Sequence, residues 1–159
     1  DGVEASGNSS VTNLFLRLRS YGLSPEFYSD AQRILRSFAP HLEQVGVSFS
    51  AMLGALHFSL SEPKEIVISG RRGDPETEAL LKEVRSEFHP NIVVAFVENG
   101  ESPETEKIIP LASGRVMVNE CATAYVCQNQ TCQLPVHSIK ELRKLLNRVF
   151  PCKKLRSGS

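Results

Sequence analysis

A change in hydrophobic periodicity after residue 60 constrains the fold of this chain more than any other feature. Between Val11 and Leu60 the apolar residues recur at the spacing of amphipathic helices. After residues 61–63 (SEP), short β-branched runs alternate with helical patterns. We therefore expect helical hairpins over residues 1–62, a small α/β part over residues 63–152, and a disordered tail over residues 153–159.

The first half predicts three helices joined by short loops. The first ends at Gly22, and the second begins at Ser24, an N-cap residue followed by Pro25 at the first helical position. Pro40 is expected to bend this second helix or to end it early. A third helix covers about residues 48–60, and loops this short make neighbouring helices antiparallel hairpins. The buried stripe predicted for the second helix comprises Phe27, Ala31, Ile34, Leu35, Phe38 and Leu42.

The second half predicts a βαβ unit and one more strand-to-helix step. Residues 65–69 (EIVIS) form a short strand, residues 75–88 a helix, and residues 91–97 (NIVVAFV) a strand that is apolar on both faces. This order indicates a right-handed unit with parallel strands. A third strand at residues 123–127 precedes a helix that begins at Ser138. The predicted fold class is α+β, with a three-stranded, mainly parallel α/β layer following the hairpins.

Composition argues against several classes of function. Lys plus Arg and Asp plus Glu both total 18, so the net charge does not favour nucleic acid. The longest apolar stretches are interrupted by polar residues and fall short of the roughly 20 residues that cross a bilayer. The chain opens with no signal-peptide pattern and without Met, so we expect it to be cut from a longer protein. Neither nucleic acid nor a membrane is an expected partner.

Cys127 and Cys132 form a C-x4-C pair that suggests redox chemistry or metal binding. Their spacing is too wide for the C-x-x-C of a dithiol oxidoreductase. As zinc ligands they would need two more groups, for which Cys121 and His137 are the nearest candidates, whereas structural zinc sites usually contain two closely spaced pairs. A disulfide is a third alternative, and free thiols are the interpretation we favour. Reduced cysteines indicate an intracellular, cytoplasmic protein, for which we expect no metal and no cofactor.

The turn at residues 70–74 (GRRGD) lies between a strand and a helix, where backbone N–H groups can hold a phosphate. It lacks the known phosphate-binding patterns, and Asp74 at the N-cap would accept those donors. Arg71 and Arg72 are therefore interpreted as solvated turn residues.

Asp1, Glu4 and Asn8 are polar residues that stand just before the first helix. A helical bundle could present them to a ligand, and paired carboxylates could act as general acid and base on a sugar-like substrate. The alternative is that they cap the helix and solvate the loop. These three residues are the ligand-binding candidates that the sequence offers.

Three segments, taken in order, resemble a known family. They are DG-x-E-x-SGNS at residues 1–9, KEIVISG before GDPETEALL at residues 64–81, and TAYVC-x4-C at residues 123–132. They are similar to the C-terminal part of the spermatogenesis-associated proteins that carry an N-terminal thioredoxin-like domain. That family looks like a thioredoxin-like domain followed by an (α/α)6 barrel, similar to six-hairpin glycosidases and to N-acylglucosamine 2-epimerase. The resemblance implies that this chain comprises the last hairpins of that toroid and the α/β appendage.

The resemblance also implies partners and two hypotheses of function. The rest of the parent chain, with its further barrel helices and thioredoxin-like domain, would be the main partner. A sugar-like small molecule would be the ligand, with Asp1, Glu4 and Asn8 near the inner rim of the barrel. In the first hypothesis the chain is part of a carbohydrate-active enzyme and is inactive alone. In the second it is a noncatalytic structural or protein-docking module, so the sequence leaves open whether the protein is an enzyme.

Overall fold

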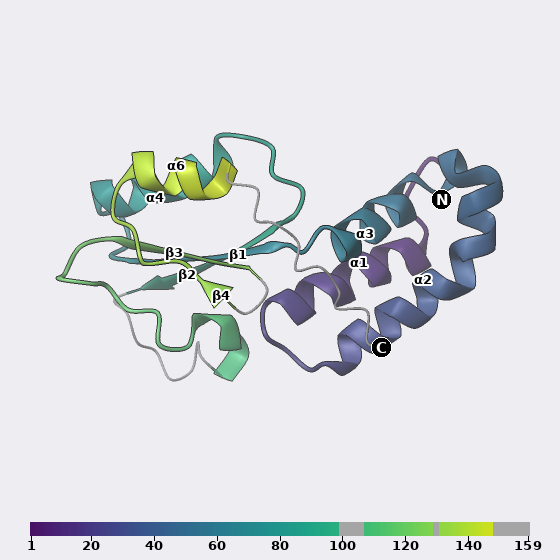
Figure 1. Cartoon of the computed structure of the whole chain (residues 1–159), viewed down its shortest axis with the longest axis horizontal. Helices are drawn as coiled ribbons and strands as arrows, with labels where there is room; N and C mark the ends of the chain where they lie inside the picture. Colours follow the sequence, from purple (N-terminus) through teal and green to yellow (C-terminus); the bar gives the residue numbers. More distant parts are fainter. Residues whose placement is uncertain (99–106, 129–130, 148–159) are drawn as a thin grey trace, which may run out of the picture.

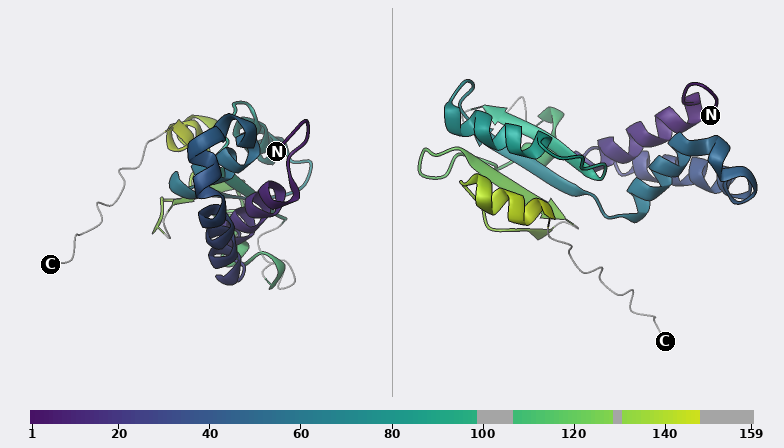
Figure 2. Two further views of the ribbon diagram at one scale, coloured as in Figure 1. Left: turned by 90° about the vertical axis from the view of Figure 1, so that its right-hand side faces the viewer. Right: turned by 90° about the horizontal axis from the view of Figure 1, so that it is seen from above.

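The chain folds into a layer of helices that lies beside an α/β layer (Figure 1). The structure is a computed structural model that describes residues 1–98, 107–128 and 131–147. The predicted tail at residues 153–159 lies outside the described residues. The right-hand view of Figure 2 shows the same division from above, with the three N-terminal helices on one side and the sheet with its covering helices on the other.

The helical layer contains α1 (Gly7–Ser20), α2 (Glu26–Val45) and α3 (Ser50–Leu60). Ser6 caps α1, because its side chain accepts a hydrogen bond from the backbone N–H of Ser9. A short 3-10 helix, η1 (Gly46–Phe49), joins α2 to α3. The core of this layer consists of Leu16, Ala31, Ala55 and Phe58, which pack together with Val93 of the sheet.

The helix α2 continues through Pro40 to Val45, so the early end considered from the sequence is wrong. Proline removes a hydrogen bond to the carbonyl four residues earlier, here that of Arg36. Both residues are exposed, so water can hydrogen-bond to that carbonyl instead. The predicted buried stripe of α2 is fully buried only at Ala31 and Leu35. Its other members, Phe27, Ile34, Phe38 and Leu42, are half-buried.

The α/β layer is a mixed four-stranded sheet with the strand order β2-β1-β3-β4. The strands β1 and β2 are parallel neighbours in the sheet, and a helix lies between them in the sequence, as predicted. The elements are β1 (Lys64–Gly70), α4 (Pro75–Arg85), β2 (Ile92–Glu98), η2 (Pro110–Ala112), β3 (Thr123–Gln128), β4 (Thr131–Cys132) and α6 (Ile139–Asn147).

The predicted three-stranded, mainly parallel layer is wrong, because β3 runs antiparallel to β1 and a fourth strand, β4, pairs antiparallel to β3. The register gives the physical reason. Glu98 at the end of β2 pairs with Gly70, and Thr123 at the start of β3 pairs with Ser69. The connection from β2 therefore leaves and re-enters the sheet at the same end, which reverses the direction of β3. The three N-terminal helices form a layer, and the described residues show no toroid.

Two different sets of residues cover the two faces of the sheet. The helices α4 and α6 pack on one face, against Ile66, Ile68, Ala124 and Val126. The other face carries Val67, Ala95, Val97 and Tyr125, which pack against Ala112 of η2 and against Tyr21, Ile109 and Leu111.

Polar contacts join the helical layer to the sheet. The hydroxyl of Tyr21, just after α1, donates to the carbonyl of Val94 at 3.1 Å. Arg17 Nη1 donates to the carbonyl of Ile92 at 3.1 Å. Both acceptors lie on β2, so the C-terminal end of α1 is fixed against this edge strand.

Candidate functional site

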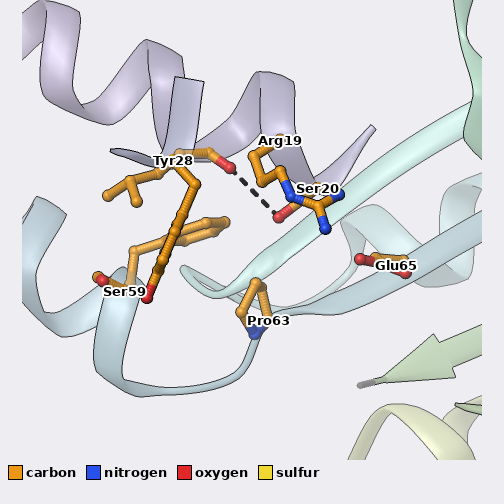
Figure 3. A pocket seen from close by; sticks show the side chains of 8 residues that line it. Arg19, Ser20, Tyr28, Ser59, Pro63 and Glu65 are labelled. Atoms are coloured by element: carbon orange, nitrogen blue, oxygen red, sulfur yellow. Dashed lines mark hydrogen bonds between the residues drawn. The ribbon is translucent and has the colours of Figure 1, made fainter. Parts of the chain in front are cut away.

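The candidate site is an open cleft of about 400 Å³ at the junction of the two layers (Figure 3). It is lined by residues of α1, the start of α2, α3 and the start of β1. Its lining residues are Leu16, Arg19, Ser20, Tyr28, Phe58, Ser59, Pro63 and Glu65. Because helices and a strand meet here at their ends, the cleft combines apolar walls with polar groups.

Glu65 and Arg19 carry the charge of this cleft, and Figure 3 shows them on the side opposite Tyr28. Both side chains belong to half-buried residues. Burial raises the pKa of the Glu65 carboxyl, and the positive charges of Arg19 and Arg115 oppose that rise. A carboxyl with a raised pKa in a cleft is a common feature of functional sites.

The walls of the cleft are aromatic and hydroxylic. Phe58 is buried, with the guanidinium of Arg17 4.7 Å from its ring centroid, whereas Tyr28 is exposed. The hydroxyl of Ser20 donates to the carbonyl of Leu16, and Ser59 is held by Gln32. The cleft therefore offers an aromatic wall and a few polar groups to a small polar molecule.

The same face of the sheet carries a disulfide next to Glu65. Cys127 lies directly opposite Glu65 in the β1–β3 pair, and Cys132 lies directly opposite Cys127 in the β3–β4 pair. Cys127 and Cys132 are joined by a disulfide bond, so the favoured prediction of free thiols is wrong. Register alone explains the bond, because antiparallel pairing places the two Cβ atoms side by side.

The metal interpretation of the cysteines finds no support in the described part of the chain. No group of three His, Cys, Asp or Glu residues is close enough there to hold a metal ion. His137 lies near the hydroxyl of Thr123 and the carbonyl of Ala122, and Cys121 is an exposed free thiol.

The Asp1 carboxylate makes hydrogen bonds that fit the capping alternative considered from the sequence. One carboxylate oxygen accepts from the backbone N–H of Ser6 and the hydroxyl of Ser9, at 2.9 and 2.5 Å. The other accepts from the backbone N–H groups of Ala51 and Met52 in the first turn of α3, at 2.9 and 3.2 Å. This carboxylate therefore stabilises the N-termini of α1 and α3 together.

Glu4 and Asn8 are exposed, and neither lines the cleft. The structure does not bring these two residues and Asp1 to the cleft that Glu65 and Arg19 line. Their binding of a ligand stays a prediction. Glu65 was not among the site residues predicted, although a carboxylate at the start of a strand rich in β-branched residues is an unusual position.

The turn after β1 fits the interpretation made from the sequence. Asp74 accepts a hydrogen bond from the backbone N–H of Thr77 and so caps α4. Arg71 pairs with Glu120 at 3.5 Å, and Arg72 pairs with Glu98 at 3.3 Å, with all four side chains largely exposed. Surface pairs of this kind contribute little to stability.

Comparison with known proteins connects the chain to one group of relatives. It is 33% identical over 147 residues to human spermatogenesis-associated protein 20, and 32% identical over 147 residues to the mouse protein. The chain matches a region of spermatogenesis-associated protein 20. An uncharacterized protein from Caenorhabditis elegans is 28% identical over 154 residues. No family model and no solved structure matches the chain.

The match covers 92% of this chain but 19% of the human spermatogenesis-associated protein 20. The relatives are therefore much longer than the segment described. Among the described residues, no helix has the length and apolar character needed to cross a membrane.

Proposed function

We propose that this chain is a noncatalytic docking module that packs against another part of a longer protein of the spermatogenesis-associated protein 20 type. The helix α3 is the observation that carries this proposal. Its sequence, SAMLGALHFSL, is apolar around most of its circumference. Helices of this composition are normally covered on all sides.

The described residues cover only one side of α3. Met52, Ala55 and Phe58 are buried, whereas Leu53 and Leu60, which lie on the opposite side, are 38% and 73% exposed. Val47, in η1 just before α3, is 95% exposed. We call the surface formed by Leu53 and Leu60 the α3 outer face.

The occupant that we propose is an apolar helix from the remainder of the parent protein. The match of this chain to about a fifth of the human relative supports this choice, since most of that protein lies outside the matched region. Helix-on-helix packing is the ordinary way to cover an apolar helical stripe.

The test compares Leu60→Lys in this chain alone and in the full-length parent protein. Leu60 lies at the end of α3, where Lys is compatible with the helix dipole and with solvent. We expect thermal unfolding of the isolated chain to change little and that of the full-length protein to shift downward by several degrees. Differential scanning calorimetry measures both.

Leu134→Lys is the matched control, because Leu134 is 85% exposed and lies outside the helical layer. It should leave the unfolding temperatures of both the isolated chain and the full-length protein unchanged. Equal effects of Leu60→Lys and Leu134→Lys in the full-length protein would contradict docking at the α3 outer face.

A second function, binding of a sugar-like molecule by the complete protein, is supported by the cleft with Glu65. Two carboxylates are needed for glycoside hydrolysis, and Glu65 is the only carboxylate among the residues that line the cleft in the described part of the chain. The second would have to come from elsewhere in the parent protein. Calorimetric titration of monosaccharides into the full-length protein, with Glu65→Gln and Glu4→Ala as variants, tests this. Loss of binding in Glu65→Gln but not in Glu4→Ala would support sugar binding in the cleft. No binding by the unmodified protein would contradict it.

A further inference from the structure

The two sulfurs of the Cys127–Cys132 disulfide lie in unequal surroundings. Cys127 is 2% exposed within β3, whereas Cys132 is exposed on β4 at the end of the strand order. A reagent in solution can therefore reach the sulfur of Cys132 far more easily than that of Cys127. This inequality resembles that of dithiols in which one thiol exchanges and the other resolves.

The positively charged guanidinium of Arg115 lies beside the exposed sulfur of Cys132. Its Nη2 atom lies 2.9 Å from Sγ of Cys132 and 3.7 Å from Sγ of Cys127. The guanidinium also stacks over the Tyr125 ring, 5.3 Å from its centroid, which holds it in place. Among the residues that the structure describes, no carboxylate lies within ion-pair distance of Arg115, and its charge acts both on the sulfurs and, from further away, on the Glu65 carboxyl.

Glu65 makes the two sulfurs still more unequal. It lies directly opposite Cys127 on the same face of the sheet, where a carboxylate disfavours a neighbouring thiolate. A thiolate would therefore be more stable at Cys132, beside Arg115, than at Cys127. Nearby cationic groups are the usual cause of a reactive protein thiolate.

We propose that Cys127 and Cys132 form a reversible thiol–disulfide exchange site for a dithiol reductant, with Cys132 as the exchanging sulfur and Arg115 as the residue that stabilises its thiolate. This site is separate from the α3 outer face, and its test does not depend on docking.

The exchange is balanced in two steps. A thiolate of the reductant attacks Sγ of Cys132, which breaks the Cys127–Cys132 bond and leaves a thiolate on Cys127. The second thiol of the reductant then attacks the reductant sulfur that is bonded to Cys132. This closes the disulfide of the reductant and releases the thiolate of Cys132. The reductant becomes an intramolecular disulfide, the protein pair gains two electrons, and the two protons of the reductant pass to the protein thiols or to water.

The fold is compatible with both oxidation states. The bond joins residues only five apart in the sequence, so it constrains the unfolded chain weakly. Cys127 stays within β3, whose pairing with β1 does not depend on the bond. Reduction is therefore expected to loosen β4 and leave the rest of the sheet in place.

The first experiment measures alkylation of the reduced chain by iodoacetamide between pH 6 and pH 9, read by peptide mass spectrometry in a Cys152→Ser background. The exposed thiol of Cys121 is the internal reference. We expect the rate for Cys132 to rise at a pH about one unit lower than the rate for Cys121. At pH 7 this corresponds to about threefold faster reaction, because the gain in thiolate is partly offset by lower nucleophilicity.

Arg115→Gln should move the Cys132 profile toward that of Cys121, and Arg115→Lys should retain part of the difference. Circular dichroism establishes that each variant is folded. Coincident profiles in the unmodified chain, or no movement in a folded Arg115→Gln chain, would overturn the proposal.

The second experiment follows the oxidised fraction of the pair in buffers of reduced and oxidised dithiothreitol, with no alkylation step during equilibration. We expect a reversible transition, and Arg115→Gln should need severalfold more reduced dithiothreitol to reach its midpoint. A pair that stays oxidised at every ratio, or that never forms the disulfide, would also refute exchange at this site.

Discussion

The Asp1 carboxylate accepts four hydrogen bonds, two from Ser6 and Ser9 at the start of α1 and two from α3. Two of them come from backbone N–H groups about fifty residues away, those of Ala51 and Met52. Hydrogen bonds to an ionised acceptor are stronger than those between neutral groups. Asp1 is therefore a structural connection within the helical layer, and its contact with a ligand stays a prediction.

We predict that Asp1→Ala lowers the free energy of unfolding by about 2 kcal/mol, the upper end of the range for loss of a helix cap. Urea unfolding followed by circular dichroism measures the change. Glu4→Ala, an exposed neighbour, should stay within about 0.5 kcal/mol of the unmodified chain. Similar losses for the two variants would show that Asp1 does not have this role.

Glu65 gives a prediction about pH. Because burial raises the pKa of this carboxyl in the folded chain, the folded state binds the proton more tightly than the unfolded state does. Stability contributed by the protonated form is therefore lost as the pH rises from about 4.5 through the folded pKa. Glu65→Gln should remove this dependence and unfold at a higher temperature than the unmodified chain at pH 7. A lower melting temperature at pH 7 would mean that attraction to Arg19 and Arg115 outweighs burial.

Among the elements, α4 and α6 are joined by a polar contact over an apolar interface. Arg143 of α6 donates from Nε and Nη2 to the two carboxylate oxygens of Glu83 on α4, at 2.6 and 2.8 Å. The side chain of Glu83 is 7% exposed. A bidentate pair of this geometry fixes the relative position of two helices more than a surface ion pair does.

The hydrogen bonds from Arg143 hold the pKa of Glu83 below its usual range. A depressed pKa contributes stability that is present above the unfolded value, about 4.5, and is lost as the pH falls through the folded pKa. We predict that Glu83→Gln lowers the melting temperature at pH 7 and that the difference from the unmodified chain shrinks as the pH falls below 4.5. Glu78→Gln, at an exposed position on the same helix, is the control and should show neither effect.

The elements also show how far a sequence can determine a fold. Periodicity and capping residues predicted α1 to α4, β1 to β3 and the parallel β1–β2 pair, because these depend on neighbouring residues. The direction of β3 depends on where the long connection after Glu98 returns, which no local pattern encodes. The two-residue strand β4 is polar and exposed, so it carries no hydrophobic signal. The cleft was missed for a similar reason, since Arg19 and Glu65 meet only after the two layers are packed.

At the scale of the whole molecule, the contacts of Arg17 and Tyr21 with β2 join the two layers. We predict that the double variant Arg17→Met, Tyr21→Phe increases hydrogen exchange in α1 while α4 and α6 remain protected, as measured by mass spectrometry. The control is Tyr28→Phe, because Tyr28 is exposed and lies on the other side of the cleft. Equal exchange in the double variant and the unmodified chain would show that apolar packing alone joins the layers.

The attachment of α1 to β2 also sets an order of events during protein synthesis. The donors Tyr21, just after α1, and Arg17, within it, precede their acceptors on β2 by 73 and 75 residues. At translation rates of roughly 5–20 residues per second, α1 waits about 4 to 15 seconds after leaving the ribosome before β2 emerges. During that interval the side of α1 that faces the sheet has no partner from β2, so a chaperone that shields this side of the helix would have its main opportunity to act then.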